Sequence, residues 1–204
     1  MNSTAFLIEK TIDDAPELTL WHGSDFLDYG KASNVKVVLA RLAEDGKLRR
    51  AIDGIYYRPK TVMGIEVPPS MHEIARKIAS LHRWNIIPSG ETALNALGLS
   101  TQVPSEYVYS SDGPYRDYSV GDISLHFRHK STRFIKGMSY KTALFAEALK
   151  ALGKEDLGES EIKALARSLT AEEINLILAE AKTAPQWIYD AATRVEKKIN
   201  GGER

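Results

Sequence analysis

The residues of this chain with the clearest chemical potential are the lysines and arginines between positions 31 and 60. This stretch, KASNVKVVLARLAEDGKLRRAIDGIYYRPK, contains eight basic and three acidic side chains, whereas residues 11–30 contain five acidic side chains and no lysine or arginine. The whole chain has 204 residues and a formal net charge of zero. A neutral chain that concentrates positive charge on one segment is suited to bind phosphate groups. The sequence therefore favours nucleic-acid binding.

The elements expected to position these side chains are a helix and a β-hairpin. Apolar residues at helical spacing predict a helix over residues 33–44 with one buried stripe. The stripe consists of Val35, Val38, Leu39 and Leu42. Ser33 suits the N-cap, and Gly46 suits a left-handed residue beyond the C-terminus. Short β-prone runs follow at residues 47–50 and 55–58, joined by the sequence AIDG. A helix followed by a basic hairpin is typical of a winged helix-turn-helix.

The helix face opposite the buried stripe indicates how this segment would contact DNA. Advancing by about 100° per residue from the stripe places small and cationic side chains on that face, which suits entry into the major groove. They are Ser33, Lys36, Val37 and Ala40, flanked by Asn34 and Arg41. Lys47, Arg49 and Arg50 on the hairpin, or wing, would contact phosphates or the minor groove. The alternative is an ordinary α+β corner whose basic side chains are solvated.

The residues before this helix supply the other parts of a winged helix. A first helix is expected over residues 1–12. The short apolar segment Leu18–Trp21 is of the kind that pairs with the wing. Residues 23–29 are expected to form the short helix before the turn, with Phe26 and Leu27 facing inward.

Prolines mark the end of the first domain. Three of them lie between residues 59 and 69, where they interrupt regular structure because proline lacks a backbone donor and restricts its neighbour. We place the boundary near Met63. The prediction is therefore a winged helix-turn-helix DNA-binding domain at residues 1–63 and a second domain at residues 64–204.

The second domain alternates helical and strand signals before it becomes wholly helical. Ser70 opens a capping box, because Glu73 follows three residues later at the start of an apolar helical pattern. Alternating residues predict strands at 106–110 and 122–129. Thr170 begins a second capping box in the helical C-terminal part. The predicted fold class is α+β, with an N-terminal winged helix-turn-helix followed by a small α+β domain that ends in a helical bundle.

Residues with catalytic potential do not form a recognised set in the sequence. There is no P-loop, no G-x-S-x-G, no H-E-x-x-H and no dinucleotide-binding fingerprint. His126 and His129 are three apart on a predicted strand, so they should point to opposite faces and not share a metal ion. Glu161 and Lys163 echo a nuclease motif but lie on a predicted helix, and Ser89 is better explained as an N-cap than as a nucleophile. We predict no catalytic residue, metal or cofactor, and no enzymatic activity.

The composition and the first ten residues of the chain indicate its cellular compartment. The chain contains no cysteine, which excludes disulfides, cysteine-bearing zinc fingers, iron–sulfur clusters and a cysteine nucleophile. It has no apolar run of about 18 residues, and Met1–Lys10 lacks the pattern of a signal peptide. The expectation is a cytoplasmic protein without a membrane partner.

Several motifs together resemble a known family. They are VVLARLAEDGKLRRAIDGIYYRP within the winged-helix block, a PP-S entry into the next helix, IPSGETALNALGLSTQVP at residues 87–104 and the strand sequence GDISLHFRHK. In these motifs the chain resembles the AbiEi-type antitoxins over nearly its whole length. These are the antitoxin halves of bacterial abortive-infection toxin–antitoxin pairs, whose partner is a nucleotidyltransferase-like toxin. The first motif is shared by many winged-helix proteins, whereas the run at residues 87–104 is considerably more specific.

The resemblance implies a promoter-binding autorepressor that binds inverted repeats in double-stranded DNA and neutralises a co-encoded toxin, directly or functionally, in phage defence. It assigns neutralisation to the second domain. By position, it assigns DNA contacts to Ser33, Asn34, Lys36, Val37 and Arg41 on the helix and to Lys47, Arg49, Arg50 and Arg58 on the wing. The alternatives are a winged-helix transcription regulator with a ligand-sensing domain and a metal-dependent nuclease guided by a winged helix.

A second basic area lies between residues 116 and 141, where six basic side chains face two acidic ones. Three interpretations are open: an extension of the DNA footprint, a contact with an acidic toxin surface, and a solvated sheet edge protected by charge. The residues predicted for this possible secondary basic surface are Arg116, Arg128, Lys130, Arg133 and Lys136.

Overall fold

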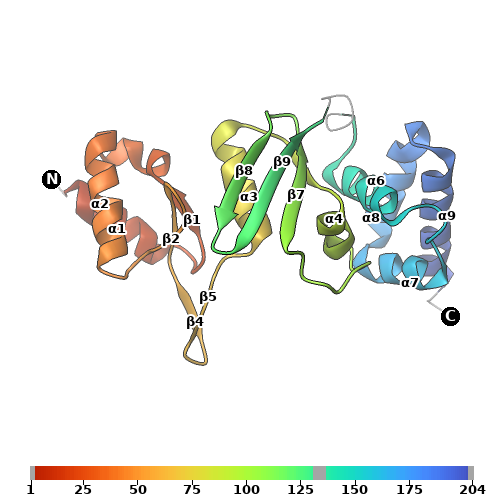
Figure 1. The fold of residues 1–204 in the computed structure, drawn as a ribbon, viewed down its shortest axis with the longest axis horizontal. Helices are drawn as coiled ribbons and strands as arrows, with labels where there is room; N and C mark the ends of the chain where they lie inside the picture. The colour runs from red at the N-terminus through yellow and green to blue at the C-terminus, as the bar shows by residue number, and fades with distance from the viewer. Residues whose placement is uncertain (1–2, 131–136, 202–204) are drawn as a thin grey trace. The chain divides into compact units, whose positions relative to one another are not determined.

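The computed structural model describes residues 3–130 and 137–201 of the chain (Figure 1). They divide into two compact units, Met1–Ser80 and Leu81–Arg204. The fold class is α+β, as the sequence predicts. Within the described ranges, no helix is both long and apolar enough to cross a membrane.

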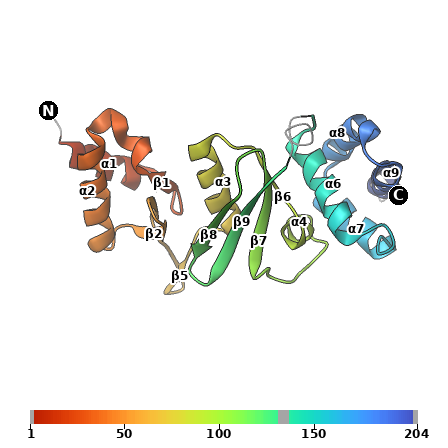
Figure 2. The ribbon, with the colours of Figure 1, turned by 45° about the horizontal axis from the view of Figure 1, so that its top comes forward.

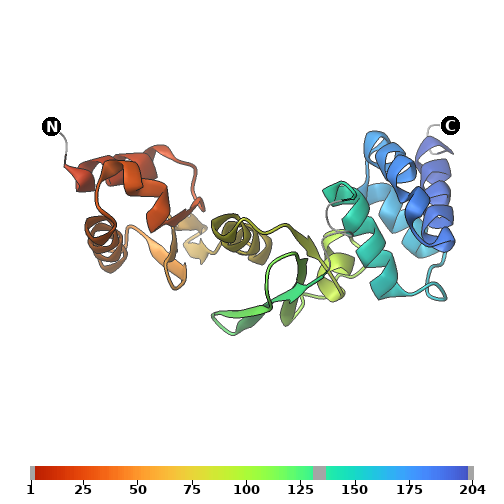
Figure 3. The same ribbon diagram turned by 90° about the horizontal axis from the view of Figure 1, so that it is seen from above.

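The first unit has the element order of a winged helix. In chain order it contains α1 (Thr4–Asp14), β1 (Leu20–His22), the 3-10 helix η1 (Gly23–Tyr29), α2 (Ala32–Glu44), β2 (Arg49–Ile52) and β3 (Ile55–Tyr57). The three strands form an antiparallel sheet in the order β1-β3-β2, so the segment before η1 pairs with the wing as expected. The helices α1, η1 and α2 pack against one another (Figure 3).

The core of the first unit confirms the predicted helical stripe of α2. All four stripe residues are at most 6% exposed, and they pack with side chains of α1, η1 and the wing. These partners are Ile8, Ile12, Phe26, Leu48 and Tyr56. Two local predictions are wrong. Lys31, without a side-chain cap, is the N-cap of α2 in place of Ser33, and Leu27 is 52% exposed because the tight 3-10 geometry turns only Phe26 into the core.

The residues after β3 correct the expected boundary near Met63. Lys60–Val62 (β4) and Ile65–Val67 (β5) pair as an antiparallel hairpin whose two-residue turn is Met63-Gly64. Both turn residues have positive φ, 50° and 80°, as a tight hairpin turn requires. The prolines therefore flank a hairpin instead of a linker. The first unit continues into α3 (Met71–His82), which opens on the predicted capping box of Ser70 and Glu73.

The second unit combines a mixed sheet with a helical bundle. Its elements are β6 (Ile86–Pro88), α4 (Glu91–Ala96), β7 (Glu106–Ser111), β8 (Arg116–Val120), β9 (Ile123–His129), α6 (Tyr140–Leu152), α7 (Glu159–Ser168), α8 (Ala171–Glu180), η2 (Ala181–Thr183) and α9 (Gln186–Gly201). The strand order is β6-β7-β9-β8, and β7 pairs parallel with β9. Helices α6 to α9 gather at the C-terminal side of this unit (Figure 2).

Two parts of the second unit differ from the sequence-based expectation. β8 forms in a segment for which the sequence predicted no strand, because it can pair with β9 through a two-residue turn at Gly121 and Asp122. Ser89 is not an N-cap. Gly90 occupies that position before α4, and the Ser89 backbone N–H donates to Val108 O at 2.9 Å, which extends the pairing of β6 with β7.

The capping box of α8 provides a stability prediction. Glu173 accepts a hydrogen bond from Thr170 N–H at 3.0 Å, and the Thr170 hydroxyl accepts one from Glu173 N–H at 3.2 Å. Lys141 Nζ of α6 lies 2.8 Å from the Glu173 carboxylate. These contacts, chiefly the one from Lys141, hold the pKa of Glu173 below its usual value. A carboxylate with a lowered folded-state pKa stabilises the fold above its unfolded pKa and loses that contribution as the pH falls through the folded-state value.

We therefore expect Glu173→Gln to lower the free energy of unfolding at pH 7 by about 0.5 kcal/mol, because glutamine keeps the capping hydrogen bond but loses the charge that attracts Lys141. The difference from the wild type should shrink in acid, since the protonated glutamic acid resembles glutamine. Urea unfolding at pH 7 and at about pH 3, below the unfolded glutamate pKa, measures both values. A difference of the same size at both pH values contradicts this account.

Candidate nucleic-acid interface

The N-terminal half of α2 presents the predicted recognition residues to solvent. Ser33, Asn34, Lys36 and Val37 are all exposed. Val37 is 66% exposed although it is apolar, and it lies on the face opposite the buried stripe. Lys36 makes no ion pair with any described residue of the chain. This part of the helix therefore has an available cation, an amide and an exposed methyl-bearing side chain on one surface.

Two of the predicted cations share one acidic partner on α1. Arg41 Nη2 and Lys47 Nζ each lie 3.1 Å from an oxygen of the Glu9 carboxylate. Both basic side chains are more than half exposed, so these ion pairs contribute little to stability and can be exchanged for a phosphate. Before DNA binds, the Glu9 carboxylate therefore partly neutralises the charges of Arg41 and Lys47.

The strand β2 of the wing presents Arg49 and Arg50, which have different partners. The Arg49 Nε donates to both Glu66 carboxylate oxygens at 3.1 Å, and its Nη1 donates to Gly46 O at 3.2 Å. This contact joins the wing to β5. The Arg50 guanidinium carbon lies 5.4 Å from the centre of the Tyr56 ring, and its Nη2 donates to the Tyr56 hydroxyl at 3.2 Å. Tyr56 therefore orients the Arg50 guanidinium.

Arg58 lies in the fold and not on the exposed part of the wing. Its Nη1 donates to Asp13 O at 2.8 Å, at the C-terminal end of α1. Its Nε is buried and has no hydrogen-bond partner among the described residues. A half-buried guanidinium bonded to a helix C-terminus is suited to hold α1 against the sheet. The structure thus separates Arg58 from the other residues that the sequence assigned to DNA contacts.

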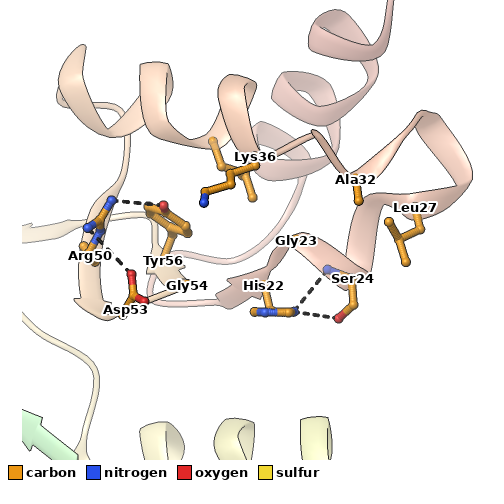
Figure 4. Close-up of a pocket in the computed structure, with 11 residues that line it drawn as sticks. His22, Gly23, Ser24, Leu27, Ala32, Lys36, Arg50, Asp53, Gly54 and Tyr56 are labelled. Carbon is orange, nitrogen blue, oxygen red and sulfur yellow. Dashed lines mark hydrogen bonds and ion pairs between the residues drawn. The ribbon is translucent and has the colours of Figure 1, made fainter. Parts of the chain in front are cut away.

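A cavity of about 390 Å³ lies between η1, the start of α2 and the wing, all within the first unit (Figure 4). It is lined by His22, Gly23, Ser24, Leu27, Ala32, Lys36, Leu39, Arg50, Asp53, Gly54 and Tyr56. Figure 4 shows Lys36 extending from α2 toward the side of the cavity that Tyr56 and Arg50 form. No sequence pattern marks this cavity, because its lining residues come from three separate segments of the chain.

In the possible secondary basic surface, carboxylates neutralise most of the positive charge of the described residues. Arg116 is exposed, whereas Arg128 Nη1 lies 2.5 Å from an Asp117 carboxylate oxygen. Hydrogen bonds from His126 first and Arg128 second hold the pKa of Asp117 below its usual value. Lys130 Nζ lies 2.5 Å from the carboxylate of Glu147, which is 4% exposed. Arg133 and Lys136 lie outside the described residues.

The residues weighed as catalytic candidates have structural partners. His126 bonds Asp117 at 2.6 Å, while His129 bonds Gly113 O at 2.9 Å, so the two rings face opposite sides of β9 as predicted. Glu161 accepts a hydrogen bond from Gly158 N–H at 2.9 Å, which caps α7. In residues 3–130 and 137–201, no group of three His, Cys, Asp or Glu side chains is placed to hold a metal ion.

The element order, the strand order and the exposed cationic helix define the first unit as a winged helix-turn-helix. The whole chain belongs to the family described as a family of unknown function (DUF6088), which matches residues 7–177. No curated protein matches the sequence significantly. Among solved structures, the fold is similar to the crystal structure of the RV2827C protein from Mycobacterium tuberculosis. That similarity has a TM-score of 0.41 and 10% sequence identity, over 97% of this chain and 76% of that chain.

Proposed function

We propose that this protein is a cytoplasmic, DNA-binding antitoxin and transcriptional autorepressor that neutralises a co-encoded toxin. The observation that carries the DNA-binding part is the surface of α2, where exposed Asn34, Lys36 and Val37 lie on a winged helix whose wing presents Arg49 and Arg50. The antitoxin part rests on the resemblance to AbiEi-type antitoxins.

The proposed binding mode follows from the chemistry of each side chain. With α2 in the major groove, the Asn34 amide can bond the edge of an adenine, and Val37 can contact a thymine methyl group. Lys36 binds a phosphate, and the wing arginines bind phosphates or enter the minor groove. Base contacts from Asn34 and Val37 then supply specificity, while the cations supply affinity and its salt dependence.

The second unit is the proposed site of toxin neutralisation. Among its described residues, twenty buried apolar side chains form one core, drawn mainly from β6 and the helices α4 and α6 to α9. A folded unit attached to a DNA-binding unit is suited to bind a partner, and the family resemblance makes that partner a nucleotidyltransferase-like toxin. Binding to inverted repeats would further require two protomers on one operator.

The second candidate function is a transcription regulator that responds to a small ligand. The cavity beside Lys36 and Arg50 favours it, because ligand pockets are typically about 300–1,000 Å³ and largely apolar. That cavity lies in the winged-helix unit and not in the second unit, so ligand sensing and antitoxin activity are compatible.

Fluorescence anisotropy with DNA tests the DNA-binding part. The probe is the labelled region upstream of the protein's own gene, and the control is a duplex of the same composition in shuffled order. We expect binding to the upstream region to be about 10³-fold tighter or more, with an affinity that falls steeply as salt rises. Equal affinity for both duplexes over the whole salt range would overturn the proposed repressor function.

A further inference from the structure

The cavity between η1, α2 and the wing combines apolar walls with cations at one side. Leu27 and Ala32 supply most of the exposed apolar surface, while Leu39 and the Tyr56 ring, which are 1% and 5% exposed, line the cavity where it meets the core. Leu27 is 52% exposed even though it is apolar, so a ligand that covers it would remove apolar surface from water. The volume of about 390 Å³ is near the lower end of ligand pockets. It suits a compact body of one to three aromatic rings.

The charged groups of the cavity determine the net charge of a suitable ligand. Lys36 and Arg50 are positive, and Asp53 is negative. The Arg50 Nη1 lies 3.9 Å from the exposed Asp53 carboxylate, whereas Lys36 has no ion-pair partner among the described residues. The lining groups thus leave an excess of one positive charge, located on Lys36. A singly charged anion matches this excess, and a dianion exceeds it.

The remaining polar groups are already occupied in holding the cavity wall. The His22 ring Nδ1 accepts a hydrogen bond from the Ser24 backbone N–H at 3.1 Å. The His22 backbone N–H donates to the Asp25 carboxylate at 2.7 Å, so the wall at the start of η1 is preformed. Arg50 is held by the Tyr56 ring and hydroxyl. A binding site whose walls are fixed in advance loses less conformational freedom on binding.

We propose that this cavity binds a small aromatic monoanion, with its rings against Leu27, Leu39 and Tyr56 and its anionic group on Lys36. This ligand and DNA then exclude each other. The exclusion rests on the proposed function, in which Lys36 and Arg50 contact DNA. A backbone phosphate of DNA would use the same cations but would leave the apolar walls uncovered. Apolar walls therefore distinguish a ligand site from a phosphate contact.

The fluorescent probe 1-anilinonaphthalene-8-sulfonate tests the site in the full-length protein, since it joins aromatic rings to one sulfonate. The uncharged N-phenyl-1-naphthylamine has the same rings without the anion. We expect saturable one-to-one binding of the sulfonate and weaker binding of the neutral probe. Equal affinity for both probes, or no saturable binding, overturns the proposal.

Three variants locate the probe. Ala32→Trp places an indole ring at the lining of the cavity and should abolish binding of both probes. Lys36→Met removes the charge while it keeps an apolar stem, so the sulfonate should bind about tenfold more weakly, the loss expected for one charge-assisted contact, while the neutral probe is unaffected. Lys31→Met is the matched control, because Lys31 is exposed and does not line the cavity. Each variant must show a cooperative melt like that of the wild type. Unchanged sulfonate affinity in Ala32→Trp overturns the assignment of the site.

The exclusion of DNA is tested with the same probe at saturation. We expect the apparent affinity for the upstream duplex to fall in the wild type and to stay unchanged in Ala32→Trp, provided that this variant still binds DNA. DNA affinity that is insensitive to saturating sulfonate overturns the regulatory part. A protein that binds the sulfonate at this site but no DNA contradicts the proposed function and leaves the ligand site established.

Discussion

Reversing the charges of Lys36 and Arg50 together should reduce binding to the upstream duplex by about a hundredfold at moderate salt. Lys36→Glu/Arg50→Glu removes two cations from the surface formed by α2 and the wing and places two anions near the phosphates. The dependence of affinity on salt should also flatten, with a slope smaller by about two or more, because at least two counterion-releasing contacts are lost. Anisotropy titrations at several salt concentrations measure both quantities.

The matched control carries the same charge change in the second unit. Lys154→Glu/Lys197→Glu alters the net charge equally, and both side chains are exposed. It should lower affinity slightly and leave the slope unchanged, because neither lysine belongs to the proposed contact surface and an exposed charge that touches no phosphate is screened by salt. If both double variants lose the same affinity, the interaction is a general response to net charge and α2 is not the contact surface.

The ion pairs of the interface predict an order among single substitutions. Lys36 meets a phosphate without losing a partner, whereas Arg41 and Lys47 must first release Glu9, and Arg49 must release Glu66. Arg41, Lys47 and Arg49 therefore gain less free energy from a phosphate contact than Lys36 does. Replacing any one of them should weaken DNA binding less than replacing Lys36. Sequence alone could not show this order, because Glu9 and Glu66 are far from their partners along the chain and the exchange depends on tertiary placement.

The parts of the fold that the sequence predicted are those in which local chemistry decides the structure. The stripe of α2, the capping boxes at Ser70 and Thr170, and the opposite faces of His126 and His129 follow from periodicity and side-chain reach. β8 was missed because its pairing with β9 depends on a nearby turn more than on its own alternation. The domain boundary was misplaced at Met63 because methionine followed by glycine forms a tight hairpin turn at this position.

The exposure of the candidate DNA-contacting side chains could be predicted where a local pattern determines it, on α2 and on the wing. The exposed face of α2 follows from the helical period, so Ser33, Asn34, Lys36 and Val37 were found. Arg58 was assigned to DNA by its position on the wing, but its partner, the Asp13 carbonyl oxygen at the end of α1, is a backbone atom that no sequence pattern marks. The cavity joins three separate segments, so its volume could be known only after η1 and the wing were placed.

The same charge reversal should separate repression from neutralisation in cells. Full-length Lys36→Glu/Arg50→Glu, expressed from an unrelated promoter together with the toxin, should restore growth as well as the wild type does. In the same cells, a reporter fused to the upstream region should remain active, because the variant no longer occupies the operator. The reason is that the two units have separate hydrophobic cores, so a surface change on α2 leaves the second unit folded.

Truncation tests the complementary half of this division. A start at Glu66 would cut within β5 and remove its partner strand β4, whereas a start at Ser70 preserves the capping box of α3. A chain beginning at Ser70 should give a cooperative melt, restore growth and leave the reporter active. The opposite pattern would contradict the division of labour: a truncated chain that melts cooperatively without restoring growth, while the full-length charge reversal also fails to restore it. Toxin neutralisation would then require the DNA-binding surface itself. Promoter repression and growth rescue would both depend on DNA binding.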